Sequence, residues 1–187
     1  MICINARTRR AGLIFRWAEP FASGERARRA DQMDVYQILM QDHRLTEQIF
    51  SDLEKTTAEE IEPRDQLFEK LRKGLEDHNV IEEEIFYPEI EKSSAMKELV
   101  ADAFEEHAEF DATLQEIAEL PVNKDEWLER ICELRELVRE HVRKEENRMF
   151  PAARRLLEET HAAELGRKVA QRKQEQTDGS LERQRRD

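Results

Sequence analysis

The feature that most restricts the fold of this chain is a pattern that occurs twice, 63 residues apart. Residues 78–88 read HNVIEEEIFYP and residues 141–151 read HVRKEENRMFP, so each begins with a histidine, has a glutamate four residues later and ends with a proline. Upstream of each segment lies another histidine, His43 or His107, directly preceded by an acidic residue. The chain therefore contains one two-histidine unit twice, which predicts two related pairs of secondary-structure elements.

The spacing of apolar residues identifies these elements as helices. From residue 34 onward apolar residues recur every three or four positions, which is typical of amphipathic α-helices. Helices are predicted to begin near residues 34, 63, 94 and 123, and Pro88 should disturb the last turns of the second because it lacks a backbone donor. Since short connections make neighbouring helices antiparallel, the expected fold is all-α, an up-down-up-down four-helix bundle.

Charge patterning divides the chain into three parts. The bundle is expected over residues 33–157, and Met33, directly before the first helical pattern, could be the true start of the protein. Residues 1–32 form an arginine-rich leader that we expect to be disordered, and residues 158–187 form a charged, weakly amphipathic tail that we expect to be flexible.

Composition indicates an acidic protein of a reducing compartment. The net charge is −12, and residues 33–161 hold 35 acidic against 17 basic side chains, a surface that repels nucleic acid and anionic membranes but can supply carboxylates to cations. Two cysteines are too few for a disulfide framework. The segment around residues 8–15 resembles a twin-arginine export signal, but its apolar run is too short. We therefore expect a cytoplasmic protein without nucleic-acid or membrane partners.

Four of the five histidines fall on the apolar stripe of a different predicted helix each. One such histidine is usually a core residue, whereas four at similar heights indicate a shared site. An acid four residues after a histidine lies on the same helix face, and a buried carboxylate without a partner costs several kcal/mol unless a cation is bound. The candidate metal ligands are His43, His78, Glu82, His107, Asp111, His141 and Glu145. This donor set suits iron, with manganese or zinc possible; Glu47 and Glu146 remain open as further ligands.

These motifs resemble the hemerythrin-like, HHE cation-binding family over about residues 34–157. The resemblance implies a four-helix bundle with two non-haem iron ions bridged by an oxo group or by carboxylates. It implies that His43 and His78 serve one iron and that His107 and His141 serve the other. The bridging carboxylates would be Glu82 and Glu145. Oxygen-carrying members place the last carboxylate five residues after its histidine, which is Glu146 here, but the helical stripe favours Glu145.

The resemblance also implies a choice between functions. Oxygen-carrying members have a second histidine where this chain has Asp111, which disfavours reversible oxygen transport. We expect an iron-binding module that binds, senses or stores iron or oxygen, with dioxygen, peroxide or nitric oxide as the small ligand. The alternative is a di-iron oxidoreductase that consumes peroxide or nitric oxide. A ferritin-like carboxylate bundle is disfavoured because the required Glu-x-x-His pattern occurs only at His161.

Overall fold

The computed structural model describes residues 33–184, with side chains to residue 178. The predicted leader, residues 1–32, lies outside this part. The described residues form helices: α2 (Val35–Leu53), α3 (Ile61–Ile81), η1 (Glu82–Phe86), α4 (Tyr87–Ile90), α5 (Lys97–Glu119), α6 (Asp125–Lys144), η2 (Glu145–Met149), α7 (Phe150–Leu156) and α8 (Glu159–Gln184). None of them is long and apolar enough to cross a membrane.

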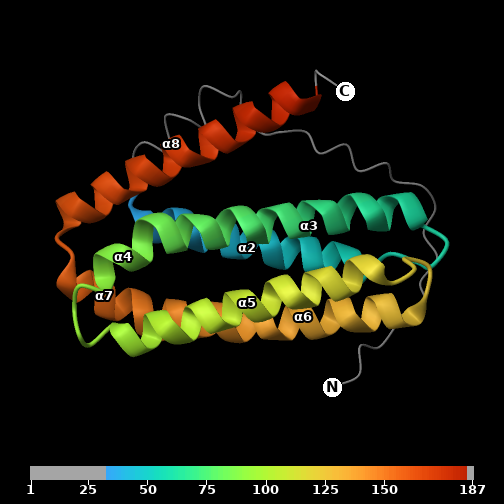
Figure 1. Cartoon of the computed structure of the whole chain (residues 1–187), viewed down its shortest axis with the longest axis horizontal. Coiled ribbons are helices and arrows are strands. Elements are labelled where there is room, and N and C mark those ends of the chain that lie inside the picture. The colour runs from blue at the N-terminus through green and yellow to red at the C-terminus, as the bar shows by residue number, and fades with distance from the viewer. Residues whose placement is uncertain (1–32, 185–187) are drawn as a thin grey trace.

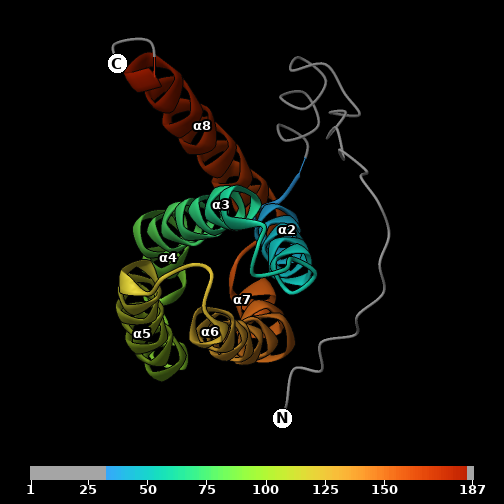
Figure 2. The ribbon, with the colours of Figure 1, turned by 90° about the vertical axis from the view of Figure 1, so that its right-hand side faces the viewer.

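The predicted all-α bundle is confirmed. Helices α2, α3, α5 and α6 lie side by side with alternating direction, and α8 crosses over one side of them (Figure 1). Seen from the end, the four helices surround a common interior (Figure 2). α2 packs against α3 and α6, and α5 packs against the same two helices. The interior is therefore lined by one stripe from each helix.

Two apolar clusters fill this interior, one toward each end of the bundle. One contains Tyr36, Phe86, Tyr87 and Phe150 among its buried residues. The other is built around Trp127, with buried side chains from α2, α3, α5 and α6. On α2, α3 and α5, and along the continuous run from α6 into η2, the histidine stands between buried residues of one cluster and buried residues of the other. The polar centre therefore lies at mid-height, sealed by apolar side chains above and below.

Each repeat contains one turn of π-helix. α3 runs without a break through η1 into α4, and α6 runs in the same way through η2 into α7. The Tyr87 N–H donates to the Glu82 carbonyl, five residues back instead of four. Because Pro88 has no N–H to complete the α-helical ladder, a wider turn is accommodated directly before it. The expected disturbance at Pro88 thus takes the form of a π segment that begins at Glu82.

The C-terminal segment differs from the expected flexible tail. Glu159–Gln184 forms the helix α8, and Ala162, Leu165 and Val169 are buried in the cluster that contains Tyr36. Gly166 permits a close approach, since a Cβ atom there would lie 2.2 Å from the Met33 carbonyl oxygen. The apolar stripe of α8 is short and made largely of small residues, so it is hard to recognise among the charges around it.

Candidate metal centre

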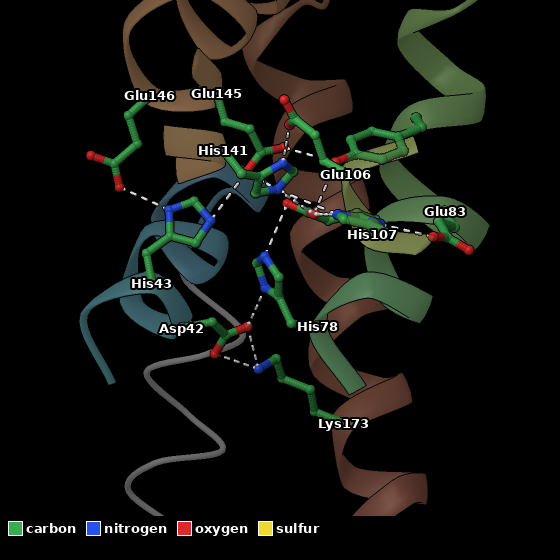
Figure 3. Close-up of polar contacts among 12 residues, drawn as sticks. Asp42, His43, His78, Glu83, Glu106, His107, His141, Glu145, Glu146 and Lys173 are labelled. Carbon is green, nitrogen blue, oxygen red and sulfur yellow. Dashed lines mark hydrogen bonds and ion pairs between the residues drawn. The ribbon is translucent and has the colours of Figure 1, made fainter. Parts of the chain in front are cut away.

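Four buried histidines from four helices form the core of the site. His43 lies on α2, His78 on α3, His107 on α5 and His141 on α6, and none is more than 6% exposed. The ring centroids of His43 and His78 are 4.9 Å apart, and those of His107 and His141 are 4.8 Å apart. The histidines thus form two close pairs, one from each repeat (Figure 3).

Two buried glutamates lie between the histidine pairs, each at the start of a π segment. Glu82 places Oε1 3.3 Å from His78 Nε2 and Oε2 3.4 Å from His107 Nε2. Glu145 Oε2 lies 3.2 Å from His43 Nε2 and 3.4 Å from His141 Nε2. Each carboxylate therefore reaches one histidine of its own repeat and one of the other repeat.

The outer nitrogen of every histidine faces a further carboxylate. The Nδ1–H groups donate to Glu146 from His43, to Glu83 from His107 and to Glu106 from His141, each at 2.8 Å, and His78 Nδ1 lies 3.5 Å from Asp42. Because a carboxylate accepts the proton on Nδ1, Nε2 is the nitrogen that presents its lone pair on the inner side once it has lost its proton. This is the arrangement in which histidine binds metals.

A tyrosine hydroxyl joins the two inner carboxylates. Tyr87 donates its hydroxyl to Glu82 at 3.0 Å or to Glu145 at 2.9 Å. Burial and the two negative charges raise the pKa of Tyr87 well above its usual value, so the hydroxyl keeps its proton. The equivalent residue of the second repeat is Phe150, which has no hydroxyl. Both rings stack on a histidine, Tyr87 on His107 and Phe150 on His43.

The pKa shifts of the inner residues indicate that the buried carboxylates favour positive charge beside them. Burial alone lowers the pKa of His78, but Glu82 and Asp42 outweigh it and raise the pKa to about 10. His141 is likewise lowered by burial but raised to about 10, chiefly by Glu145. Burial raises the pKa of Glu82, yet the adjacent imidazoles hold it well below its usual range. In the metal-free protein, protons on His78 and His141 therefore compensate the buried carboxylates.

The buried polar atoms fit a metal cation better than they fit one another. His43 Nε2, His78 Nε2, Glu82 Oε1 and Glu145 Oε2 are buried and make no hydrogen bond. One group of possible ligands combines these four residues, and a second combines Glu82, His107 and His141. Within each group the donor atoms lie within 4.8 Å of one another. Unpaired buried polar groups are costly, and a cation between them removes that cost.

The two groups contain six of the seven ligands predicted from the sequence. The seventh, Asp111, is exposed on α5 and belongs to neither group. Successive residues of an α-helix are rotated by about 100°, so an acid four residues after a histidine is turned by about 40° from it. On α3 this rotation leaves Glu82 within the buried stripe. On α5, His107 lies at the edge of the buried stripe, so the same rotation turns Asp111 toward solvent. Glu47, four residues after His43, is turned away from the centre for the same reason, because His43 lies at the edge of the buried stripe of α2. Its carboxylate pairs with Arg135 and Arg139.

The histidine or carboxylate partners of five supporting residues are not assigned by the sequence alone, although Glu146 remains open there as a further ligand and Glu83 is interpreted as solvated or as supporting the ligands. The five residues are Asp42, Glu83, Tyr87, Glu106 and Glu146. The four acids occupy matched positions in the two repeats, one before the first histidine and five after the second. That symmetry was the available signal. Which carboxylate faces which histidine depends on how the helices pack, since Glu83 and Glu146 support histidines of the opposite repeat.

A small cavity of about 10 Å³ adjoins the histidines and has room for about one water molecule. Thr46 and Asn79 line it from the first repeat, and their counterparts Phe110 and Val142 line it from the second. The side-chain amide of Asn79 is buried and makes no hydrogen bond through either its nitrogen or its oxygen. The cavity is therefore polar on the side of His43 and His78 and apolar on the other side.

A four-helix bundle that encloses four histidines and two shared carboxylates defines a class of helical cation-binding proteins. The chain matches the model of the hemerythrin HHE cation-binding domain over residues 34–153 and belongs to this family. It is also similar to a DNA nickase of Nostoc sp. (strain PCC 7120 / SAG 25.82 / UTEX 2576), with 26% identity over 122 residues. That match covers 65% of this chain and 34% of the nickase, so the chain spans about a third of that protein's length. No solved structure matches the chain.

Proposed function

We propose that this protein binds two non-haem iron ions and takes up one small oxygen- or nitrogen-containing ligand beside them. The observation that carries the proposal is the presence of two groups of buried donor residues that share Glu82, with four donor atoms of the first group making no hydrogen bond. His43, His78, Glu82 and Glu145 would hold one ion. His107 and His141 would hold the other, with Glu82 as the shared carboxylate. Bound iron supplies the capacity to bind and reduce such ligands; manganese and zinc fit the same donors.

Protein side chains define where the small ligand would bind. The cavity has room for about one water molecule, and its unpaired amide belongs to Asn79, next to the ligand His78. An amide can donate a hydrogen bond to dioxygen, peroxide or nitric oxide or accept one from a protonated species. The ligand would therefore bind on the side of His43 and His78, and the protein would act in binding, sensing or storage of iron or oxygen.

An oxidoreductase that consumes peroxide or nitric oxide is the second candidate. The observation that favours it is the Tyr87 hydroxyl, which holds a proton between Glu82 and Glu145. Reduction of peroxide or nitric oxide develops negative charge on oxygen, and this hydroxyl is a buried hydrogen-bond donor within the centre. The two candidates differ in turnover, since an enzyme consumes its ligand repeatedly and a binding protein takes it up once per site.

Metal analysis of the purified protein tests the first part of the proposal. Wild type should contain about two iron ions per chain, and the His78→Ala/His141→Ala double variant should contain almost none. Asp111→Ala is the matched control, because this acid is exposed on the same bundle and lies outside both groups. Equal metal content in wild type and the double variant would refute the proposal.

Ligand binding tests the second part. Azide, added to the air-oxidised iron form and followed by its visible absorption, should bind two- to tenfold more weakly to Asn79→Val, as expected for one lost hydrogen bond. This change copies Val142 from the second repeat. Unchanged azide affinity would place the ligand elsewhere. Rapid peroxide consumption that disappears in Glu145→Ala would favour the oxidoreductase instead.

A further inference from the structure

The helix α8 lies outside the family match, which ends at residue 153, yet it reaches the metal centre. Val169 anchors it in the apolar core, and one turn further on Lys173 extends to Asp42. The Nζ atom of Lys173 lies 2.6 Å from both oxygens of the Asp42 carboxylate (Figure 3). Asp42 is also the partner of His78 Nδ1. One carboxylate is thus shared between α8 and a candidate metal ligand.

The second repeat provides an internal comparison. There, Glu106 accepts the His141 Nδ1–H with Oε2 at 2.8 Å and contacts Lys144 with the other oxygen, Oε1. Each partner has its own oxygen, and the histidine contact is short. On Asp42, Lys173 occupies both oxygens, and the contact to His78 is 3.5 Å, the longest of the four histidine–carboxylate contacts. The histidine contact is long where a lysine competes for the carboxylate.

The charges act in the same direction as the geometry. The Asp42 carboxylate lies between the His78 ring and the Lys173 ammonium, so both groups can hold it by hydrogen bonds. A strong hydrogen bond from Nδ1 to an ionised carboxylate makes Nε2 a better metal ligand. By drawing Asp42 away, Lys173 weakens this effect. Its positive charge also opposes the binding of a cation beyond His78.

We propose that Lys173 is a positioning residue that competes with His78 for Asp42, so that docking of α8 lowers the metal affinity of the group formed by His43, His78, Glu82 and Glu145. This inference rests on the proposed function, because it concerns the same metal centre. It assigns to α8 a regulatory role: the centre binds its cation more tightly when Lys173 leaves Asp42.

Nuclear magnetic resonance of the metal-free protein tests the competition directly. In Lys173→Met the signal of the His78 Nδ1–H proton should move downfield, because the hydrogen bond from Nδ1 to Asp42 shortens. Lys173→Arg should restore the wild-type position. Arg172→Met is the control for helix docking: the neighbouring side chain pairs with exposed Glu84 and does not reach Asp42. An unchanged or upfield-shifted His78 signal in Lys173→Met would overturn the inference.

Metal release measures the consequence. In the zinc-loaded protein, Lys173→Met should slow the release of one zinc ion to a chelator about three- to tenfold, less than the 10–100-fold effect of removing such a partner altogether. Arg172→Met should release zinc like wild type. Faster or unchanged release in Lys173→Met would contradict the inference. Failure of wild type to bind zinc or iron would refute the proposed function, while the metal-free experiment would still decide whether Lys173 competes with His78.

Discussion

At the scale of single residues, the centre depends on hydrogen bonds that fix each donor atom. The histidines are oriented by carboxylates on Nδ1, and the inner carboxylates are held by the Tyr87 hydroxyl. The two repeats differ here, since Phe150 replaces Tyr87 in the second. The inner carboxylates therefore share one donor, and its removal should affect both of them.

Tyr87→Phe should destabilise the metal-free protein by about 1.5–3 kcal/mol, the typical contribution of a hydrogen bond to a charged group. Denaturation in urea measures this loss, which should shrink when metal is bound because the cation then compensates the carboxylates. The control is Tyr36→Phe. Tyr36 is equally buried, but its hydroxyl has no hydrogen-bond partner, so its removal should not destabilise the protein. Equal losses in both variants would contradict the role of Tyr87.

The pH dependence of stability follows from the same contacts. In the metal-free protein the pKa values of His78 and His141 rise to about 10 from about 6.5. A histidine whose pKa is higher in the folded than in the unfolded state stabilises the folded state. This stabilisation is complete at a pH below the pKa of the unfolded state, and it is lost as the pH rises through the pKa of the folded state. The melting temperature of metal-free protein should therefore fall between about pH 6.5 and pH 10. Constant melting temperature over this range would show that the histidines are not protonated.

Metal affinity should depend on pH in the opposite direction to the stability of the metal-free protein. His78 and His141 must release the inner proton before Nε2 can bind a cation, so metal affinity rises with pH and acid releases the metal. Chelator competition at pH 5.5 and pH 8 measures this change. Weaker metal binding at the higher pH would contradict the assignment of the histidines as ligands.

At the scale of helices, backbone geometry decides which side chains reach the centre. The two π segments begin at Glu82 and Glu145, and each ends two residues before a proline, Pro88 or Pro151. Helix packing also depends on how closely two backbones approach each other. The clearest case is Gly166, where the backbone of α8 lies against the residues that precede α2.

Two glycine substitutions test this packing. Gly166→Ala places a Cβ atom 2.2 Å from the Met33 carbonyl oxygen and should destabilise the protein by about 1–3 kcal/mol through overpacking. Gly74→Ala, inside α3 with no atom within 4 Å of the new Cβ, should stabilise it by about 0.5–1 kcal/mol. Urea denaturation of both variants measures the difference. Effects of the same sign would show that α8 does not approach the bundle this closely.

Sequence reasoning succeeded where the information is local to one helix. The apolar spacing and the repeat predicted the bundle, and the four-residue step from His78 and His141 predicted Glu82 and Glu145 as inward-facing acids. The same step failed for Asp111, because the result depends on where His107 stands on its stripe. It also missed α8, whose small buried side chains such as Ala162 carry little signal. The partners of Nδ1 require knowledge of which helices are neighbours.

At the scale of the whole molecule, the polar centre divides the apolar core into two clusters. Buried histidines and carboxylates occupy space that a bundle of this size would otherwise fill with apolar side chains. Much of the binding free energy of the metal should therefore appear as folding free energy.

Metal removal tests this dependence. At a free metal concentration about 100 times its dissociation constant, binding adds about 2.7 kcal/mol, which corresponds to about 5–10 °C in melting temperature for a protein of this size. Calorimetry of the loaded protein with and without a chelator measures the shift. The His78→Ala/His141→Ala variant should show almost none, and an equal shift in that variant would mean that the metal binds elsewhere.

The crossing of carboxylates between repeats has a consequence for assembly of the centre. His43 depends on Glu146, and His107 depends on Glu83, so each helical hairpin orients a histidine of the other. A single hairpin therefore holds only half of every such pair, whereas two copies facing each other would complete them all. In the present chain a cation would have a complete set of donors only after the second hairpin has been synthesised and has closed on the first.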